Sequence, residues 1–395
     1  MVFSAFFKKG KFINKLQELP LPRMNLKFTT SDYLKINSHA AFGSGLRNWY
    51  RMHRDNKFDI DPRFIPKALF ITFNILSSAP VRIYERLKYD KKIKEVKVKQ
   101  PLFILGYYRS GTTFLHYLLS KDPRFAFCAT YEVMMPHIFL SSGKFSKSIL
   151  TAALPANRPM DNLKMGADLP KEEEFALASI GVESLAAGYF FPKRLQEFFD
   201  KYVLFNNLKS EANWKNNLDY FLKKVSYKYG DKPLVIKSPA NTGRIKQILD
   251  LYPDAKFIHI HRNPYQVYLS NERLYEKILP MLAFHKVDNK TVEEFIFNSY
   301  AATYRNYFEQ KSLIKPENLY EFSYADFTSN PVDNLRNAYR HLGYEGFENT
   351  ENLFREELAN YKNYETNKFN LSPELKQTIY KRWKPVFDGL GYSQD

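Results

Sequence analysis

The stretch that decides the fold covers residues 101–122 and is PLFILGYYRSGTTFLHYLLSKD. Its first six residues form an apolar run of the length typical of a buried strand. A glycine-bounded loop follows, and in the next segment Phe114, Leu115, Leu118 and Leu119 recur at helical spacing. Strand, loop and helix in this order predict the first half of a βαβ unit.

A second unit of the same kind lies near the middle of the chain. The strand-like KPLVIKS covers residues 232–238, a helical pattern ends at Tyr252, and KFIHIHR at 256–262 predicts the next strand. Such alternation is typical of the α/β class, here a P-loop-like parallel sheet flanked by helices. Further elements are expected as a strand at 318–324 and as helices near 264–279, 291–311, 331–341 and 373–388, the last of them ending at Gly389.

The first quarter of the chain differs in charge from the rest. Residues 1–100 hold 21 Lys+Arg against 8 Asp+Glu, so they carry +13 of the formal net charge of +17. Residues 1–98 are therefore predicted to form a helical basic extension laid against an α/β domain at 99–395. Anionic lipid, nucleic acid or an acidic substrate would each be attracted by this charge, and a simple solvated face explains it equally well.

Composition excludes several classes of protein. With 395 residues and 44% hydrophobic residues the chain is not mainly disordered, and its lone Cys128 forms no internal disulfide or multi-cysteine metal site. A reducing, cytoplasmic setting is expected. Residues 68–79 are apolar but fall short of the roughly 20 residues that span a bilayer. In residues 1–15 four phenylalanines lie among lysines, which predicts either contact with an anionic membrane surface or packing of these rings on the domain.

The loop after the first strand has the composition of a phosphate-binding site. Gly106 and Gly111 stand at the G-x4-G spacing of a P-loop, which gathers backbone N–H groups and a helix N-terminus around one anion. The loop continues with further donors, namely Arg109, Ser110, Gly111, Thr112 and Thr113. A tight turn with a capped helix is the alternative, and it needs fewer donors than this run supplies.

One position separates this loop from those of nucleoside triphosphatases. Their loops end in Gly-Lys-Ser/Thr, where the lysine reaches the β- and γ-phosphates and the hydroxyl holds magnesium. Here Thr112 stands in place of the lysine, and the cation is Arg109 inside the loop. This pattern favours a ligand with a single 5′-phosphate group and disfavours a metal-bridged phosphoryl transfer. No metal is expected.

Five stretches within residues 102–344 together resemble one family. They are FILGYYRSGTTFLHYLLSKDPRF, YEVMMP, MGADLPKEEEF, LVIKSPANTGRIKQILDLYPDAKFIHIHRNPYQVYLS and YEFSYADFTSNPVDNLRNAYRHLGY. The chain resembles the sulfotransferases that use 3′-phosphoadenosine 5′-phosphosulfate (PAPS), in particular the bacterial and tyrosylprotein sulfotransferase-like branch. The resemblance implies transfer of a sulfuryl group from PAPS to a hydroxyl or amine acceptor, with adenosine 3′,5′-bisphosphate as the second product.

The resemblance also assigns residues to the nucleotide. The loop from Arg109 to Thr113 would bind the 5′-phosphosulfate, and Phe114 would stack on the adenine, unless it is a core residue of its helix. Arg262 and Ser270 match the pair that holds the 3′-phosphate, and an arginine fork with a hydroxyl suits a phosphate monoester. Tyr324 matches a tyrosine that seats the adenine, its alternative being an ordinary strand aromatic.

The reaction needs a base and a cation beside the transferring group. Lys237 matches the lysine that approaches the sulfuryl group, although a surface lysine in a loop is the alternative, and Arg109 would add charge. Many relatives place a histidine shortly after that lysine, where this chain has Asn241. Glu132 stands where the tyrosylprotein branch has its base, so it is the predicted base; its alternative is an acid interacting with a helix dipole.

Several nearby residues are weaker candidates. Residues 172–174 are three glutamates that match an acidic element of the family, although charge runs at helix starts are mostly solvated. His116 and His137 are expected to be packed or surface histidines. The R-K-G-x-x-G-x-W loop that closes over the 3′-phosphate in cytosolic relatives is absent from the sequence, and its proposed replacements are Lys362, Lys368 and Arg382.

Two rival functions remain on the sequence alone. A P-loop nucleotide kinase is disfavoured by the missing lysine, and a non-catalytic protein that binds membranes or nucleic acid is disfavoured by the paired phosphate sites. The acceptor is expected to be a lipid or glycan hydroxyl, because a basic N terminus rich in aromatic residues suits a membrane-bound molecule.

Overall fold

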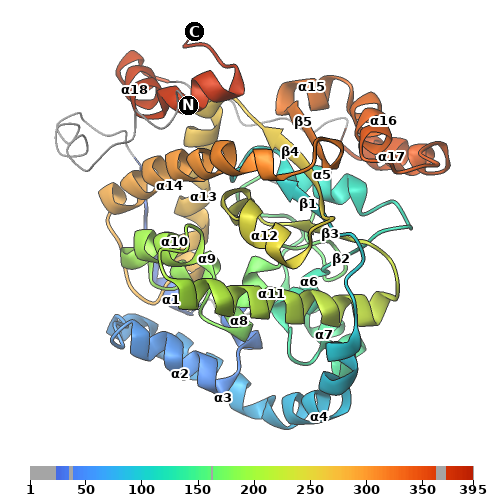
Figure 1. Cartoon of the computed structure of the whole chain (residues 1–395). Helices are drawn as coiled ribbons and strands as arrows, with labels where there is room; N and C mark the ends of the chain where they lie inside the picture. The colour runs from blue at the N-terminus through green and yellow to red at the C-terminus, as the bar shows by residue number, and fades with distance from the viewer. Residues whose placement is uncertain (1–23, 35–38, 162, 362–370, 395) are drawn as a thin grey trace.

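The computed structural model describes residues 24–34, 39–161, 163–361 and 371–394. Its centre is a five-stranded sheet in which every neighbouring pair of strands is parallel, in the order β2-β3-β1-β4-β5 (Figure 1). The strands are β1 Leu102–Leu105, β2 Ala126–Phe127, β3 Leu234–Lys237, β4 Lys256–His261 and β5 Leu319–Ser323. The predicted α/β class is confirmed, and four strands were expected; β2 was not, since two residues carry no period.

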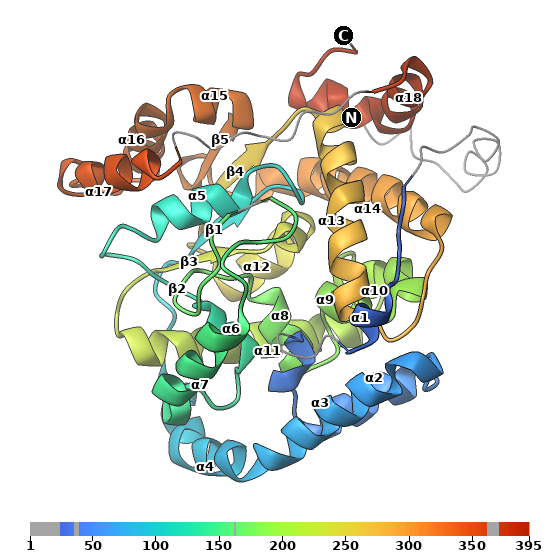
Figure 2. The ribbon, with the colours of Figure 1, turned by 180° about the vertical axis from the view of Figure 1, so that it is seen from behind.

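The faces of the sheet follow from the alternation of side chains along each strand. Leu102 and Ile104 point to one face and pack with helices α5, α16 and α17, whereas Phe103 and Leu105 point to the other and pack with α11, α12 and α14. Both faces are thus covered, as the apolar runs of a parallel sheet require. Figures 1 and 2 show the two layers of helices on either side of the strands.

The predicted helices form, and their ends are as follows. The helices after the first strand are α5 Thr112–Leu119, α6 Thr130–Met134, α7 Phe139–Ala153, α8 Glu174–Ile180, α9 Leu185–Gly188, α10 Leu195–Tyr202, α11 Leu208–Tyr229, α12 Ile245–Leu251, α13 Pro264–Leu282, α14 Asn289–Gln310, α15 Tyr324–Ser329, α16 Pro331–His341, α17 Glu348–Ala359 and α18 Pro373–Leu390. The short 3-10 helices are η3 Ala40–Gly43, η4 Pro62–Phe64, η5 Pro192–Arg194, η6 Pro239–Gly243, η7 Lys311–Leu313 and η8 Pro316–Asn318.

Two predicted boundaries were wrong. Helix α18 does not stop at Gly389, which lies inside the helix where its missing side chain makes room for the Phe308 ring, 2.5 Å from an ideal Cβ. The helix ends instead at Gly391, whose φ of +75° suits glycine. Tyr324 does not end a strand but begins α15, because the Ser323 hydroxyl accepts a hydrogen bond from the Asp326 N–H at 3.0 Å and caps that helix.

The N-terminal segment is helical, as predicted. Its helices are α1 Thr30–Leu34, α2 Leu46–Asp55, α3 Ile65–Ser77 and α4 Ala79–Glu95. Trp49, Met52 and Ile71 belong to the same buried cluster as the sheet residue Phe103. Helices α2, α3 and α4 run along the lower edge of the molecule in both views (Figures 1 and 2). The predicted membrane contact of residues 1–15 lies outside the described residues, and the boundary at residue 98 stays a prediction.

Membrane-spanning length was tested helix by helix. Within the described part of the chain no single helix is long and apolar enough to cross a bilayer. One pair, Pro62–Ser77 with Ala79–Glu95, meets the length and composition criteria jointly and is bent by 45°.

Candidate active site

The predicted site residues come from the carboxyl ends of four neighbouring strands. The loop with Arg109 follows β1, Lys237 is the last residue of β3, Arg262 directly follows β4, and Tyr324 directly follows β5. Because these strands are adjacent and parallel, their ends meet at one edge of the sheet. The topology therefore gathers side chains that lie more than 200 residues apart in the sequence.

A first cavity, here called the donor cavity, lies at this edge and has a volume of about 460 Å3. Eight of the nine predicted nucleotide-binding residues line it, namely Arg109, Gly111, Thr112, Thr113, Phe114, Arg262, Ser270 and Tyr324. The ninth, Ser110, is fully buried behind the loop, where its N–H bonds to the Tyr107 carbonyl at 3.2 Å. The structure thus brings together nearly the whole predicted set.

Two glycines allow the loop to pass close to neighbouring groups. Gly106 has φ +141°, and a side chain there would meet the Ile260 carbonyl at 2.3 Å. Gly111 has φ +98°, and its ideal Cβ would lie 2.4 Å from the Tyr324 ring. Helix α5 then starts without a side-chain N-cap, so its first N–H groups are not taken by a capping residue. A helix start of this kind beside a cavity is a favourable position for an anion.

Arg109 spans both halves of the site. Its φ of +73° is a left-handed conformation, rare for a residue with a side chain. Its Nε donates to the Ser270 hydroxyl at 2.9 Å, and one terminal nitrogen donates to the Asp161 carboxylate at 2.6 Å. The guanidinium therefore reaches toward the predicted 3′-phosphate pair, whereas the resemblance assigned Arg109 to the 5′-phosphosulfate.

Arg262 and the aromatic residues complete the donor cavity. The Arg262 guanidinium lies 4.6 Å above the Tyr324 ring, and one of its nitrogens donates to the Arg109 carbonyl at 3.3 Å. Phe114 is half-buried, with its ring centre 5.1 Å from that of Tyr361. A cavity lined by aromatic rings, two arginines and a serine hydroxyl suits a purine nucleotide with more than one phosphate.

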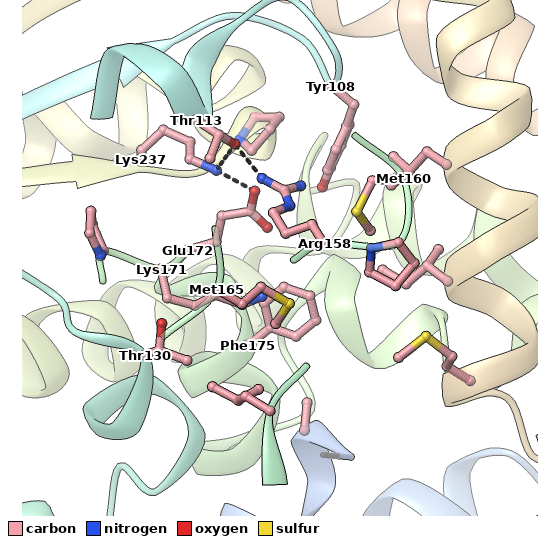
Figure 3. Close-up of a pocket in the computed structure, with 18 of the residues that line it drawn as sticks. Tyr108, Thr113, Thr130, Arg158, Met160, Met165, Lys171, Glu172, Phe175 and Lys237 are labelled. Atoms are coloured by element: carbon pink, nitrogen blue, oxygen red, sulfur yellow. Dashed lines mark hydrogen bonds and ion pairs between the residues drawn. The ribbon is translucent and has the colours of Figure 1, made fainter. Parts of the chain in front are cut away.

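A second cavity, here called the acceptor cavity, adjoins the first (Figure 3). Arg109, Thr112 and Thr113 line both, so the phosphate loop forms the wall between them. At the junction the Lys237 ammonium is ion-paired with Glu172 and lies 3.3 Å from the Thr113 hydroxyl oxygen. Arg158 donates to the same hydroxyl oxygen at 3.0 Å.

The charged groups at this junction shift one another's pKa values. Burial alone would raise the pKa of Glu172, but the Lys237, Lys171 and Arg158 charges outweigh it and hold the pKa below its usual range. Burial lowers the pKa of Lys237, and it lowers that of Lys171 to about 8. Glu172 is thus ionised at neutral pH among three cationic side chains.

The far part of the acceptor cavity is apolar. Its walls come mainly from methionine, leucine and isoleucine side chains, namely Met134, Leu154, Met160, Met165, Leu274, Ile278, Met281 and Leu282. Methionine is unbranched and polarizable, so such walls adapt to apolar molecules of different shape. The charged cluster of Arg158, Glu172 and Lys237 therefore lines a cavity whose other walls are mainly apolar.

Glu132, the predicted base, is elsewhere. Its carboxylate is fully buried, ion-paired with Lys228, and accepts hydrogen bonds from the Tyr229 hydroxyl and the Ala129 N–H, both at 2.8 Å. It lines neither the donor nor the acceptor cavity. Glu132 thus lies outside both cavities, and the carboxylate that lines the acceptor cavity is Glu172.

The expectation of solvated glutamates at 172–174 was wrong. Glu174 is buried and makes a two-point ion pair with Arg244, at 2.6 and 3.0 Å. Glu173 is buried and accepts from the Asn241 amide at 2.6 Å, and burial raises its pKa to about 7. Asn241, in the position of the relatives' histidine, is thus a partner of Glu173. The run was misjudged because helical spacing does not reveal which charges find partners.

The weaker candidates are accounted for as follows. His116 and His137 are packed inside, as expected, and burial lowers their pKa values to about 3 and about 4. Arg382 does not replace the missing 3′-phosphate loop, because its guanidinium makes a two-point ion pair with Glu294 at 2.8 Å and lines neither cavity. Lys362 and Lys368 lie outside the described residues.

Sequence reasoning missed two residues of the site. Arg158 and Asp161 lie between α7 and α8, in a segment without periodicity. Asp161 bridges Arg109 and Arg158, which outweigh its burial and lower its pKa. Only their position between the cavities identifies them. Across the described ranges no three His, Cys, Asp or Glu side chains gather as a metal site would need.

Comparison with known proteins gives concordant matches. A sequence model described as the sulfotransferase family matches residues 101–349. Omega-hydroxy-beta-dihydromenaquinone-9 sulfotransferase Stf3 of Mycobacterium bovis is 29% identical over 354 residues, which cover 89% of this chain and 91% of that protein. The protein of the same name from Mycobacterium tuberculosis matches to the same extent.

Two solved structures share the fold. Sulfotransferase STF1 from Mycobacterium tuberculosis superposes with a TM-score of 0.63 at 14% identity, over 92% of this chain and all of that chain. Sulfotransferase STF9 from Mycobacterium avium gives a TM-score of 0.61 at 20% identity, over 79% and 82% of the two chains. At these identities the likeness concerns the fold.

Proposed function

This chain belongs to the sulfotransferase family, whose members take a sulfuryl group from PAPS, and from that premise we propose that its acceptor is the hydroxyl end of an elongated apolar molecule. The acceptor would lie in the acceptor cavity with its hydroxyl at the polar junction. The single observation that carries this proposal is the Glu172–Lys237 pair at the point where an apolar cavity meets the phosphate loop.

The donor cavity suits PAPS in shape and charge. Because Gly111 has no side chain, the loop packs closely against Tyr324. Two arginines line the cavity together with several hydroxyl groups, among them those of Thr112, Thr113 and Ser270. Arg262 and Ser270 would hold the 3′-phosphate, with Arg109 bonded to Ser270 beside them. Thr112, Thr113 and the start of α5 would hold the 5′-phosphate.

The acceptor oxygen must lose its proton as it becomes a nucleophile. PAPS supplies the sulfuryl group, whose sulfur gains a bond to the acceptor oxygen as its bond to the 5′-phosphate oxygen breaks. Glu172 would take the acceptor's proton, since it is the one carboxylate among the described residues lining the acceptor cavity. Lys237 and Arg158, both beside the Thr113 hydroxyl, would stabilise the negative charge that develops between the two oxygens.

A relative supports the class of acceptor. The curated Mycobacterium bovis protein is named for a hydroxylated menaquinone, a molecule that carries a long apolar chain. Methionine and leucine walls offer few partners for the hydroxyl groups of a sugar, so a lipid hydroxyl fits this cavity better than a glycan hydroxyl. A kinase reaction is not favoured, because the loop lacks its lysine.

Calorimetric titration with adenosine 3′,5′-bisphosphate tests the donor cavity, with ADP and AMP as comparison ligands. Loss of the charge-assisted bonds in Arg262→Ala should weaken binding on the order of 10- to 100-fold. Arg336→Ala, which removes a half-buried arginine of α16 that lines neither cavity, is the matched control and should leave binding unchanged. Equal binding of ADP by the parent protein would overturn the assignment of Arg262 and Ser270.

Turnover with radiolabelled PAPS tests the acceptor. A long-chain isoprenoid alcohol in detergent should be sulfated, and a monosaccharide should not. Met160→Asp, which places a charge in the apolar wall, should raise KM for the isoprenoid alcohol while leaving the affinity for adenosine 3′,5′-bisphosphate unchanged. Preferential sulfation of the monosaccharide would refute the lipid proposal.

A further inference from the structure

The outer surface of helices α3 and α4 carries a continuous apolar stripe. Within each helix its members recur at steps of three or four residues, so they fall on one side of that helix. They are large and strongly exposed: Ile65 44%, Leu69 64%, Phe73 66%, Leu76 51%, Ile83 61% and Leu87 81%. An exposed run of large apolar side chains on this scale is unusual for a surface that faces only water.

The part of the stripe on α3 contains no charge. Between Phe64 and Arg82 the chain has a single charged residue, Lys67, and its side chain is buried and donates to the Met281 carbonyl at 3.0 Å. The opposite side of α3 is also apolar, since Ile71 and Ile75 are fully buried in the core. Helix α3 is therefore apolar toward the protein and apolar toward the outside.

Positive charge borders the stripe at one end. Lys88, Lys91, Lys92 and Lys94 on α4 are exposed. Of the acidic residues of this helix, Glu85 is buried and ion-paired with Lys224, Asp90 is paired with Arg86, and Glu95 is exposed. A charge-free apolar stripe next to a lysine cluster is the composition of a helix that rests at the interface of an anionic bilayer.

Helix α3, which carries most of the stripe, also packs against segments that line the acceptor cavity. The Phe70 ring of α3 lies 5.7 Å from that of Phe42 in η3, and Ala40 of the same 3-10 helix lines the cavity. Met281, whose carbonyl holds Lys67, lines it as well. Helix α3 thus packs on two segments that line the cavity. Figure 3 shows the N-terminal segment at the bottom of the view, below the cavity.

We propose that α3 and α4 dock the enzyme on an anionic lipid surface, with the stripe from Ile65 to Leu87 placed among headgroups and acyl chains and the α4 lysines on the anionic headgroups. The pair does not leave the protein to span the bilayer, because its inner face is part of the core. A second copy of the chain is a poorer occupant, since two lysine clusters would meet. Docking stands on this surface alone; delivery of a lipid hydroxyl into the cavity rests on the proposed function.

Vesicle flotation of the full chain tests the docking. Vesicles of phosphatidylcholine with phosphatidylglycerol should carry the protein, and Leu69→Glu with Phe73→Glu should reduce the bound fraction on the order of tenfold or more. The matched control is Leu313→Glu with Leu353→Glu, which adds the same charges at exposed leucines of η7 and α17 and should float like the parent. Thermal unfolding checks that both double variants are folded.

Other outcomes overturn the proposal. Equal flotation of the α3 variant and the parent, or binding that disappears only when residues 1–15 are deleted, would remove α3 and α4 from the membrane contact. A dimer in analytical ultracentrifugation that Leu69→Glu with Phe73→Glu dissociates, without flotation, would assign the stripe to a second copy. Turnover of a detergent-dissolved alcohol separates the two proposals: its retention in the variant, with flotation lost, leaves the proposed function intact.

Discussion

Two lysine–glutamate pairs, Glu132–Lys228 and Glu172–Lys237, lie near the same sheet and differ in what surrounds them. Glu132 is fully buried, with a tyrosine hydroxyl and a backbone N–H as additional donors, and Lys228 lies over two tyrosine rings. The Glu172 side chain keeps 18% of its surface exposed, toward a cavity. Nearly the same pair of charges is thus enclosed in the core in one place and lines the acceptor cavity in the other.

The difference shows that an ion pair becomes a catalytic candidate through its access and not through its residue types. Buried pairs with complete hydrogen bonding contribute to the stability of one arrangement, and breaking them leaves an uncompensated charge. A pair at a cavity wall retains lone pairs that an acceptor hydroxyl can reach. The same substitution should therefore lower kcat strongly at Glu172 and leave the kcat of the folded enzyme unchanged at Glu132.

The largest expected effect is on turnover. At temperatures where the variant is folded, Glu172→Gln should lower kcat by about 10²- to 10⁴-fold, because the amide cannot accept the acceptor's proton. Glu351→Gln, which removes a half-buried carboxylate paired with Arg336 outside both cavities, is the matched control and should retain full activity. Because cationic neighbours hold the pKa of Glu172 low, parent activity should persist to mildly acidic pH and decline only as pH falls through that lowered value. Unchanged kcat in Glu172→Gln would remove it as the base.

The next effect concerns folding. Glu132→Gln should lower the free energy of unfolding by about 2–4 kcal/mol, because Lys228 loses its buried partner. At temperatures where the variant is folded, kcat should equal that of the parent. Urea unfolding and turnover measured side by side check both statements, and a large fall in kcat at unchanged stability would restore Glu132 as the base.

The smallest effect is a pH dependence of stability beside the site. The pKa of Glu173 is raised by burial to about 7, so between its unfolded value and 7 the folded state binds more protons than the unfolded state. Stability from this group is complete below the unfolded pKa and is lost as pH rises through 7. Glu173→Gln should therefore be more stable than the parent at pH 8, on the order of 2 kcal/mol, and similar to it at pH 4.

Urea unfolding of this variant and its parent at the two pH values gives the measurement. Glu356→Gln, on the surface of α17, supplies the control. A stability difference that stays constant with pH would show that Glu173 does not titrate in this range.

Much of the fold and of the donor cavity was predictable. Strand-length apolar runs fixed β1, β3, β4 and β5, and the glycines of the phosphate loop are dictated by backbone approach, as the contacts of Gly106 and Gly111 show. The family motifs supplied the residues lining the donor cavity. These signals are local, because a strand, a turn and a helix start can each be recognised from a few consecutive residues.

The acceptor side was not predictable in the same way. Arg158 and Asp161 stand in an irregular segment, and Glu172 belongs to a run of three glutamates whose members have three different environments. Matching Glu132 to a relative's base placed a carboxylate in the right part of the sequence, but the side chain turned toward α11 and Lys228. Burial and partner choice depend on segments far away in the sequence.

By itself the sequence determined the class of the sheet, the phosphate loop, the charge of the N-terminal segment and the donor, because periodicity, glycine spacing and motif chemistry act over short distances. Only the tertiary structure decided which glutamate lines the acceptor cavity, how apolar that cavity is, and that α3 leaves an uncharged stripe outside. These features arise where chain segments meet, so the free energy that sets them is distributed over contacts that no local pattern contains.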